Sequence, residues 1–199
     1  DTASYSSGSG SANIVFTTTV AEGDNAASDL SVSAYTGTIT DAAGGAAAVT
    51  GTVDLGAVVV DGDAPDFVSV AATDGTYNIG DTLTITATWD EAVVVTGTPT
   101  LTLSNGDTAT YSSGSGSTAL VFTTTVADGD TDSSDLSVSS YSGTIADAGG
   151  GTAGAASGDL GAVVVDGSTP DITGCDATDG TYGPADAISI TCTYNEAVT

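Results

Sequence analysis

The chain repeats itself, and the length of the repeat limits what it can fold into. The segment YSSGSGSANIVFTTTVAEGD, which begins at Tyr5, returns as YSSGSGSTALVFTTTVADGD at Tyr111, 106 residues later. Further along, Leu55 matches Leu160 at a spacing of 105. One residue is therefore lost in the Gly- and Ala-rich stretch between these matches, which a loop tolerates and a strand does not. A repeat of about 105 residues is too long for a solenoid turn and fits a small sandwich domain.

Both ends of the chain align with the interior of the repeat. Asp1 aligns with Asp107, and Thr199 aligns with Val94. We therefore predict the C-terminal part of one repeat at residues 1–61, a complete repeat at 62–166 and the N-terminal part of a third at 167–199. We expect the chain to be a stretch of a longer tandem array. The alternative is that the terminal part of one molecule completes the initial part of the next by adding strands.

Alternation of apolar and polar residues predicts β-strands, and no stretch has helical periodicity. In LTITATW, Leu83, Ile85, Ala87 and Trp89 share one face, which we expect to be buried. Further strands are expected at FVSVAAT, TLTLSN, ALVFTTTV, LSVSSYS and LGAVVV, with turns at DGTYNIGD, TGTP, SNGD, SGSG, DGDTDSSD and DAGGG. About seven strands in about 100 residues predict an all-β fold of tandem immunoglobulin-like β-sandwich domains.

The charge of the chain has one sign. It carries 26 acidic side chains and no Lys, Arg or His, a formal charge of −26. Nucleic acids and anionic membrane surfaces attract proteins through Lys and Arg, so neither is expected as a partner. No base is present to activate a Ser or Thr nucleophile, and we therefore expect no enzyme. Membrane insertion is not expected, since no apolar run reaches the length of a span.

The acidic residues gather where consecutive repeats join. The junction VVVDGDAPDF contains Asp61, Asp63 and Asp66, and the strand that includes Trp89 returns to the same pole and ends in Asp90 and Glu91. Ca²⁺ takes six to eight oxygen ligands, and five neighbouring carboxylates repel one another without a cation. These residues therefore predict a Ca²⁺ site. The alternative is a set of solvated Asp residues that favour turns.

A weaker set of the same kind occurs at the next junction, VVVDGSTPDI. It consists of Asp166, Asp171, Asn195 and Glu196, with Ser168 in place of Asp63. Asp147, like Asp41 one repeat earlier, is expected to join from the preceding repeat if its loop reaches the junction. The loop DGDTDSSD at 128–135 resembles the start of an EF-hand but lacks its later Gly and Glu, which favours an acidic hairpin loop.

The two cysteines lie at aligned positions of neighbouring strands. Cys175 aligns with Val70 and Cys192 with Ala87, which flank the first turn of the repeat symmetrically. We predict a disulfide between Cys175 and Cys192, which stabilises by roughly 3 kcal/mol in the chain-entropy model. Such a bond favours an oxidising compartment. Two small buried thiols are the alternative.

The complete repeat resembles a known family. The run DGTYNIGDTLTITATWDEAVVVTGTPTLTLSNGD, followed by GTIADAGG and VVVDGSTPD, resembles the bacterial immunoglobulin-like repeats of giant surface adhesins and is most similar to swimming-associated surface repeats of marine bacteria. The resemblance covers essentially all 199 residues. Two features depart from it: the usual Ser before Glu-Ala-Val is Asp90 or Asn195, and the family's Lys and Arg are missing.

This resemblance implies a cation-stabilised array at the cell surface that forms a stalk, sheath or filament. Its partners would be neighbouring repeats of the same or identical chains. Similar repeats in large structural proteins of marine phages make a virion fibre or decoration protein an alternative. A carbohydrate-binding surface module is a further alternative, but sugar sites need exposed aromatic residues, whereas Trp89 is expected in the core and most tyrosines recur with the repeat.

Overall fold

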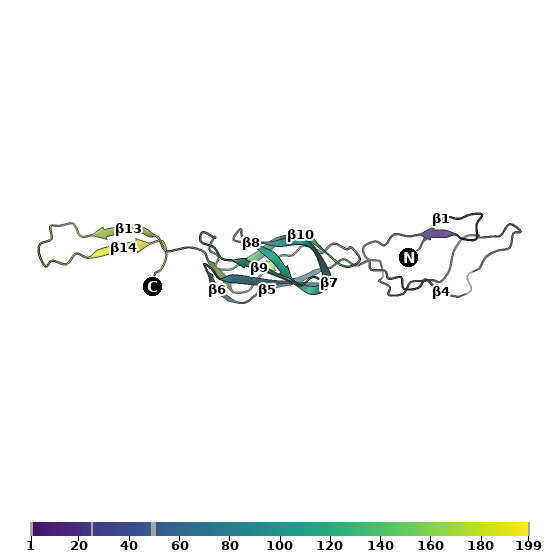
Figure 1. The fold of residues 1–199 in the computed structure, drawn as a ribbon, viewed down its shortest axis with the longest axis horizontal. Helices are drawn as coiled ribbons and strands as arrows, with labels where there is room; N and C mark the ends of the chain where they lie inside the picture. Colours follow the sequence, from purple (N-terminus) through teal and green to yellow (C-terminus); the bar gives the residue numbers. More distant parts are fainter. Residues whose placement is uncertain (1, 25, 49–50, 199) are drawn as a thin grey trace.

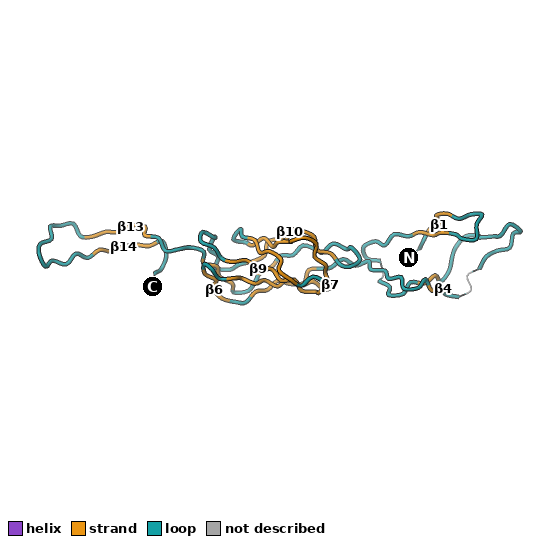
Figure 2. The backbone as a smooth tube through the Cα atoms, in the orientation of Figure 1, coloured by secondary structure: helices purple, strands orange, loops and turns teal. Residues whose placement is uncertain are grey.

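The structure, a computed structural model, describes residues 2–24, 26–48 and 51–198. Its regular secondary structure in these ranges is entirely β-strand, which confirms the all-β prediction. Figures 1 and 2 show an elongated molecule with three parts in a row. We call them the N-terminal segment (residues 1–61), the middle segment (62–166) and the C-terminal hairpin (167–199).

Most strands belong to the middle segment. They are β5 (Phe67–Ala72), β6 (Gly75–Asn78), β7 (Thr82–Leu103), β8 (Thr108–Ser113), β9 (Ser117–Thr125), β10 (Ser137–Ala146), β11 (Gly158–Asp159) and β12 (Val163–Asp166). The N-terminal segment has only short strands: β1 (Ser4–Ser7), β2 (Val15–Thr17), β3 (Ser31–Val32) and β4 (Val53–Asp54). The C-terminal hairpin pairs β13 (Ile172–Ala177) with β14 (Ile190–Tyr194).

The long strand β7 organises the middle segment. Its first half lies between β5 and β9, with Val70 opposite Ala87 and Ile85 opposite Phe122. Its second half pairs with β8 and β10, and β12 pairs in parallel with β6. One strand thus takes part in two sets of pairings, as expected when an all-β chain folds toward two packed layers.

Two predicted turns contain strand instead. The prediction of a turn at TGTP, residues 96–99, is wrong, because β7 continues through it to Leu103. Gly97 has a φ of 77°, and the register with β10 shifts between Ser142 and Thr144, close to this point. The strand therefore bends toward new partners without reversing. Likewise, part of the predicted turn DGTYNIGD forms β6, because β12 pairs with it.

The core lies within the middle segment, between Val70 and Val165. The inward face predicted for LTITATW is confirmed: Leu83, Ile85, Ala87 and Trp89 are at most 1% exposed. Burial of each large apolar side chain contributes about 1.5–3 kcal/mol. The ring of Trp89 packs edge-to-face against Phe67 and Tyr141, with ring centroids 6.0 and 6.5 Å away. Trp89 is therefore part of the core, as expected.

The same residue types are exposed in the flanking segments. Phe16 is 43% exposed, whereas its counterpart Phe122 is 0% exposed. Ile190 is 66% exposed, whereas its counterpart Ile85 is 0% exposed. These segments contain only part of the repeat, so their apolar faces lack the strands that cover them in the middle segment.

Candidate cation site at the segment junction

Three carboxylates from separate parts of the chain meet where the N-terminal segment joins the middle segment. Asp61 is the last residue of the N-terminal segment, Glu91 lies in β7 just beyond Trp89, and Asp147 follows β10. One oxygen of each carboxylate lies within 4.8 Å of the other two. Asp61 is exposed, Glu91 is half-buried and Asp147 is buried. The group therefore spans the junction.

Asp147 is held by its own loop. Its Oδ1 accepts the N–H groups of Gly150 at 2.5 Å and Gly151 at 2.9 Å. Gly150 has a φ of 100°, a left-handed conformation that favours glycine. Gly151 also leaves no room for a side chain, since an added Cβ would collide with Oδ2 of Asp147. The DAGGG sequence thus fixes the carboxylate of Asp147 near Asp61 and Glu91.

The position of Asp147 differs from the sequence expectation. We expected it to approach the junction that follows its repeat, at Asp166, but it lies at the junction that precedes it. The cause is the antiparallel pairing of β10 with β7, in which Ala146 is opposite Val94. This pairing brings the end of β10 to the pole that holds Glu91.

Asp90 and Asp66 form a local backbone link. Oδ1 of Asp90 accepts the N–H of Asp66 at 2.8 Å, and the N–H of Asp90 donates to the carbonyl of Asp66 at 3.0 Å. At the next junction Asn195 makes the same two bonds with Asp171, at 2.6 and 3.0 Å. An amide oxygen serves there as well as a carboxylate, so this position needs an acceptor and not a charge.

The predicted five carboxylates are therefore only partly brought together. Asp61 and Glu91 meet, and Asp147 joins them. Asp63, Asp66 and Asp90 lie outside this triad. Burial raises the pKa of Glu91 above its usual range, and the nearby charges of Asp61, Asp147, Asp90 and Asp63 raise the pKa further. The negative charge of Glu91 is therefore unfavourable in the folded chain, and binding of a cation or a proton would stabilise this group.

The second junction places Asp166 and Glu196 in a similar position. Oδ1 of Asp166 and Oε1 of Glu196 are both inaccessible to solvent and have no hydrogen-bond partner among the described residues. Desolvation raises the pKa of Glu196, and the charges of Asp166, Asp132 and Asp171 add to the rise. Buried oxygens of this kind are costly unless a donor or cation meets them.

Asp132 is a junction residue that the sequence reasoning missed. Its Oδ1 accepts the N–H of Gly167 at 2.8 Å, and its Oδ2 accepts the hydroxyl of Ser168 at 3.0 Å. In the previous repeat the aligned positions are Ala26, Gly62 and Asp63. The acidic residue thus lies before the second junction, as Asp132, but after the first junction, as Asp63. The paired exchange of Ala26 and Asp63 for Asp132 and Ser168 is the signal that could have revealed it.

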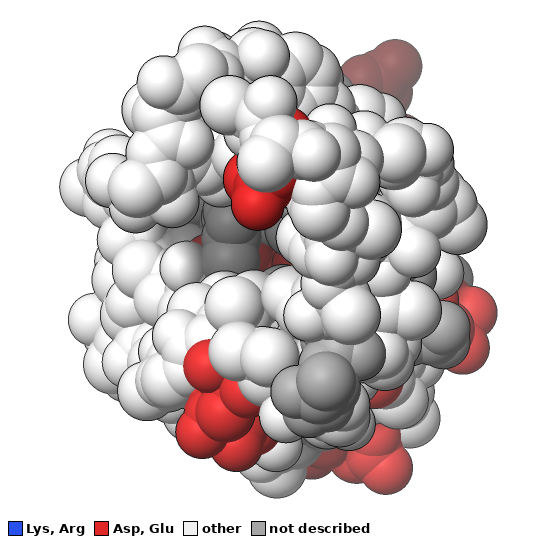
Figure 3. All heavy atoms as spheres, turned by 90° about the vertical axis from the view of Figure 1, so that its right-hand side faces the viewer, with Lys and Arg blue, Asp and Glu red and all other residues white. Residues whose placement is uncertain are grey.

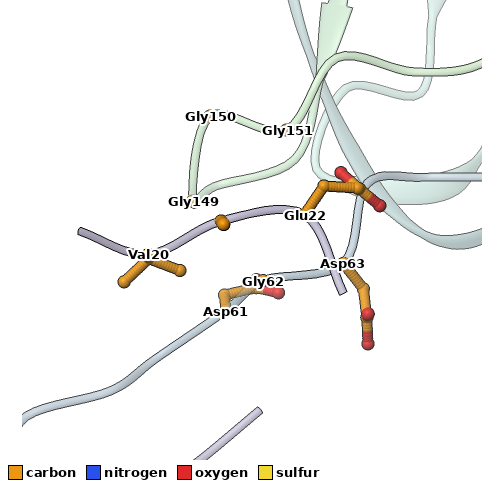
Figure 4. A pocket seen from close by; sticks show the side chains of 9 residues that line it. Val20, Glu22, Asp61, Gly62, Asp63, Gly149, Gly150 and Gly151 are labelled. Carbon is orange, nitrogen blue, oxygen red and sulfur yellow. The ribbon is translucent and has the colours of Figure 1, made fainter. Parts of the chain in front are cut away.

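Between the segments lies a pocket of about 240 Å³ (Figure 4), lined by Val20, Ala21, Glu22, Asp61, Gly62, Asp63, Gly149, Gly150 and Gly151. The N–H of Gly23 donates to the carbonyl of Gly62 at 2.7 Å, and Glu22 accepts the N–H of Ala64 at 3.3 Å. A Cβ on Gly62 would lie 2.7 Å from the carbonyl oxygen of Asp24, so only glycine allows this close approach. The polar lining suits a hydrated ion.

The tyrosines that recur with the repeat are held by local hydrogen bonds. The phenol groups of the six repeated tyrosines all make hydrogen bonds to nearby backbone. Four of these groups donate to a carbonyl and two accept an N–H; the residues are Tyr5, Tyr35, Tyr77, Tyr111, Tyr141 and Tyr182. Such recurring bonds are structural. In the end-on view of Figure 3, acidic side chains form separate patches and no basic side chain is present.

Cys175 and Cys192 form a disulfide and lie opposite each other in the hairpin. No helix among the described residues is long and apolar enough to cross a membrane. No protein-family model, curated protein or solved structure matches the chain.

Proposed function

We propose that this chain is part of an extracellular tandem array of immunoglobulin-like β-sandwich repeats that forms a stalk, sheath or filament, with Ca²⁺ at the junctions. The observation that carries the proposal is the meeting of Asp61, at the end of one repeat, with Glu91 and Asp147 of the next. The chain has no basic side chain to offset these charges. A cation from solution is the available counter-charge.

The ligands fit a hard cation. Carboxylate oxygens are the ligands that Ca²⁺ prefers, and it tolerates irregular geometry and shared water. Three carboxylates supply at most six oxygens, and Oδ1 of Asp147 already accepts two N–H groups. Water and backbone carbonyls must therefore complete the six to eight ligands of Ca²⁺. The polar pocket at the junction has room for such water.

Binding there would couple two repeats mechanically. Asp61 lies outside the folded core, whereas Glu91 and Asp147 are positioned by β7 and β10. A cation shared among them restricts the hinge between repeats. It also stabilises the fold by mass action, by about 2.7 kcal/mol when the ion is at 100 times its Kd.

One feature supports an extracellular location. The disulfide between Cys175 and Cys192 is of a kind that persists in oxidising compartments. A virion fibre would place the same demands on the chain, whereas no observed surface favours the carbohydrate-binding alternative.

The test is a Ca²⁺ titration of the chelator-treated chain. Thermal unfolding is followed by the fluorescence of Trp89, the single tryptophan, and hinge flexibility by small-angle X-ray scattering. We expect the Tm to rise by roughly 10 °C at saturating Ca²⁺ and the scattering profile to become that of a stiffer rod. Asp61→Asn should reduce the stiffening, because it removes a ligand at the first junction only, whereas Asp179→Asn, in the turn of the C-terminal hairpin, should leave it unchanged. Unchanged Tm and scattering in Ca²⁺ and in excess EDTA would refute the cation site.

A further inference from the structure

The linker at the first junction is held from both sides. Its beginning is fixed by the N-terminal segment, because the carbonyl of Gly62, a buried residue, accepts the N–H of Gly23 at 2.7 Å. Its end is fixed by the middle segment, because the carbonyl of Pro65, which is fully buried, accepts the N–H of Gly154 at 3.0 Å. Only residues 63–64 lie between these two anchors.

The same anchors recur at the second junction, in the linker that leaves the middle segment. The carbonyl of Gly167 accepts the N–H of Gly129 at 2.9 Å. A Cβ on Gly167 would lie 2.5 Å from the carbonyl oxygen of Asp130, so this glycine also packs directly on a loop of the preceding repeat. On the far side, Asp171 is tied to Asn195 by the two bonds described above. The middle segment thus holds both the linker that enters it and the linker that leaves it.

The two residues between the anchors have limited conformational freedom. The hydrogen-bonded carbonyls of Gly62 and Pro65 fix the peptide planes at the two ends of the linker. The proline ring holds its own φ at about −65° and restricts the preceding Ala64 to extended conformations. The φ and ψ angles of Asp63 and Ala64 therefore account for most of the bending that the linker permits.

A glycine-rich loop of the middle segment lies against these two residues. A Cβ on Gly151 would lie 3.0 Å from Cα of Ala64 and 3.2 Å from its Cβ. A Cβ on Gly149 would lie 3.2 Å from Cβ of Asp61, just before the linker. Figure 4 shows this loop, residues 149–151, near the linker. The loop leaves no space for Ala64 to move toward it, and it therefore limits bending on that side.

We propose that bending between consecutive repeats is confined to a two-residue hinge, Asp63–Ala64 at the first junction and Ser168–Thr169 at the second, and that the loop 149–151 limits bending of the first hinge on one side. The hinge rests on the tandem arrangement of repeats in the proposed function, but not on the cation. The three carboxylates of the candidate site lie on both sides of the first hinge, Asp61 before it and the other two after it. A cation bound there would hold the hinge in its closed position.

The hinge residues of the two junctions differ in how they are held. Ser168 and Thr169 each donate a side-chain hydroxyl to an aspartate of the preceding loop 128–132, at 3.0 and 3.4 Å. At the first junction Ala64 has no side-chain donor, and its backbone N–H donates to Glu22 at 3.3 Å. We therefore expect the first hinge to bend more easily than the second when no cation is bound.

Distance distributions between two spin labels on the full chain test the first hinge, in EDTA so that the cation plays no part. The labels are attached at Ser6→Cys in β1 and Thr110→Cys in β8, both exposed positions, whereas the native cysteines are joined in the disulfide. Ala64→Gly should widen the distribution up to roughly twofold, because glycine populates positive φ about as readily as negative φ. Ala71→Gly, the same change within β5, should leave the width unchanged.

The role of the loop is tested with the same labels. Gly151→Ala should shift the mean distance, because the added methyl group must displace Ala64 or Asp147. Gly154→Ala is the matched control, because its methyl group would make only ordinary contacts, the nearest atom being 3.7 Å away. An unchanged mean distance for Gly151→Ala would overturn the role of the loop.

The width of the distribution decides whether the hinge exists. Equal widths for Ala64→Gly and Ala71→Gly would show that bending occurs elsewhere, and the proposal would then be wrong. A wider distribution for Ala64→Gly supports the hinge even if added Ca²⁺ fails to narrow the distribution of the unaltered chain. That failure would contradict the cation site of the proposed function alone.

Discussion

The N-terminal segment and the second part of the middle segment, residues 107–166, are similar in sequence and differ in structure. The run VFTTTV occurs in both, yet β9 extends over nine residues and β2 over three. Phe122 is buried and Phe16 is exposed. The difference lies in β7, which covers β9 and has no counterpart beside β2. Strand formation here depends on partners far along the chain more than on local preference.

The largest expected effect on the free energy of unfolding comes from truncating the aligned phenylalanine to alanine in each segment. Phe122→Ala should lower the free energy of unfolding by about 3–5 kcal/mol, because it opens a cavity in a packed core. Phe16→Ala should change it by less than about 0.5 kcal/mol, because the side chain is already half exposed in the monomer. Urea unfolding at low protein concentration, followed by Trp89 fluorescence, measures both. Equal losses would mean that the N-terminal segment has its own closed core.

The two junctions allow a smaller and more local comparison. Asp132→Ala removes the acceptor for the N–H of Gly167 and the hydroxyl of Ser168. It should lower the free energy of local opening at the junction by about 1–2 kcal/mol. Amide hydrogen exchange at Gly167 should therefore accelerate roughly 5- to 30-fold. The double variant Asp132→Ala/Ser168→Asp recreates the residues of the first junction and should recover part of the protection.

Ser168→Asp alone is the control for that exchange experiment. It places a second carboxylate beside Asp132 and should not protect Gly167 further. If Asp132→Ala leaves the exchange of Gly167 unchanged, the acid does not hold the junction, and the two junctions are not equivalent in structure.

The alternation of residues was sufficient to predict the inward faces of the strands. Leu83, Ile85 and Trp89 are buried as expected, because one face of a strand packs on the core whatever its neighbours are. The continuity of β7 was not predictable in the same way, since Gly97 and Pro99 favour turns locally. The pairing of β10 with β7 keeps that stretch extended, and this pairing joins residues distant in sequence.

The candidate site was predictable only in part for the same reason. Asp61 and Glu91 could be brought together from strand direction, because β5 leaves the junction and β7 returns to it. Asp147 was assigned to the wrong junction, because its position depends on the direction of β10 in the sheet. Asp132 was missed because acidic loops are usually solvated, and only its hydrogen bonds across the junction distinguish it.

The smallest expected effect concerns the charge of Glu91 in the absence of a divalent cation. Its pKa is raised in the folded chain above the usual 4.5, so the folded state binds the proton more tightly than the unfolded state does. Stability from this group is therefore greatest below about pH 4.5 and declines as the pH rises through the raised pKa. Glu91→Gln removes the titration. In EDTA near pH 7 it should stabilise the middle segment by less than about 1 kcal/mol.

The increase in stability caused by Glu91→Gln should vanish when the pH falls below about 4.5, because Glu91 is then protonated in both the folded and the unfolded state. With saturating Ca²⁺ the sign should reverse, because the variant then lacks a ligand and the unaltered chain has its repulsion offset. Asp179→Asn, in the turn of the C-terminal hairpin, should show neither behaviour. Urea titrations with and without Ca²⁺ at each pH separate the cases. A variant that is less stable in EDTA at pH 7 would show that Glu91 is held by donors and not repelled by its acidic neighbours.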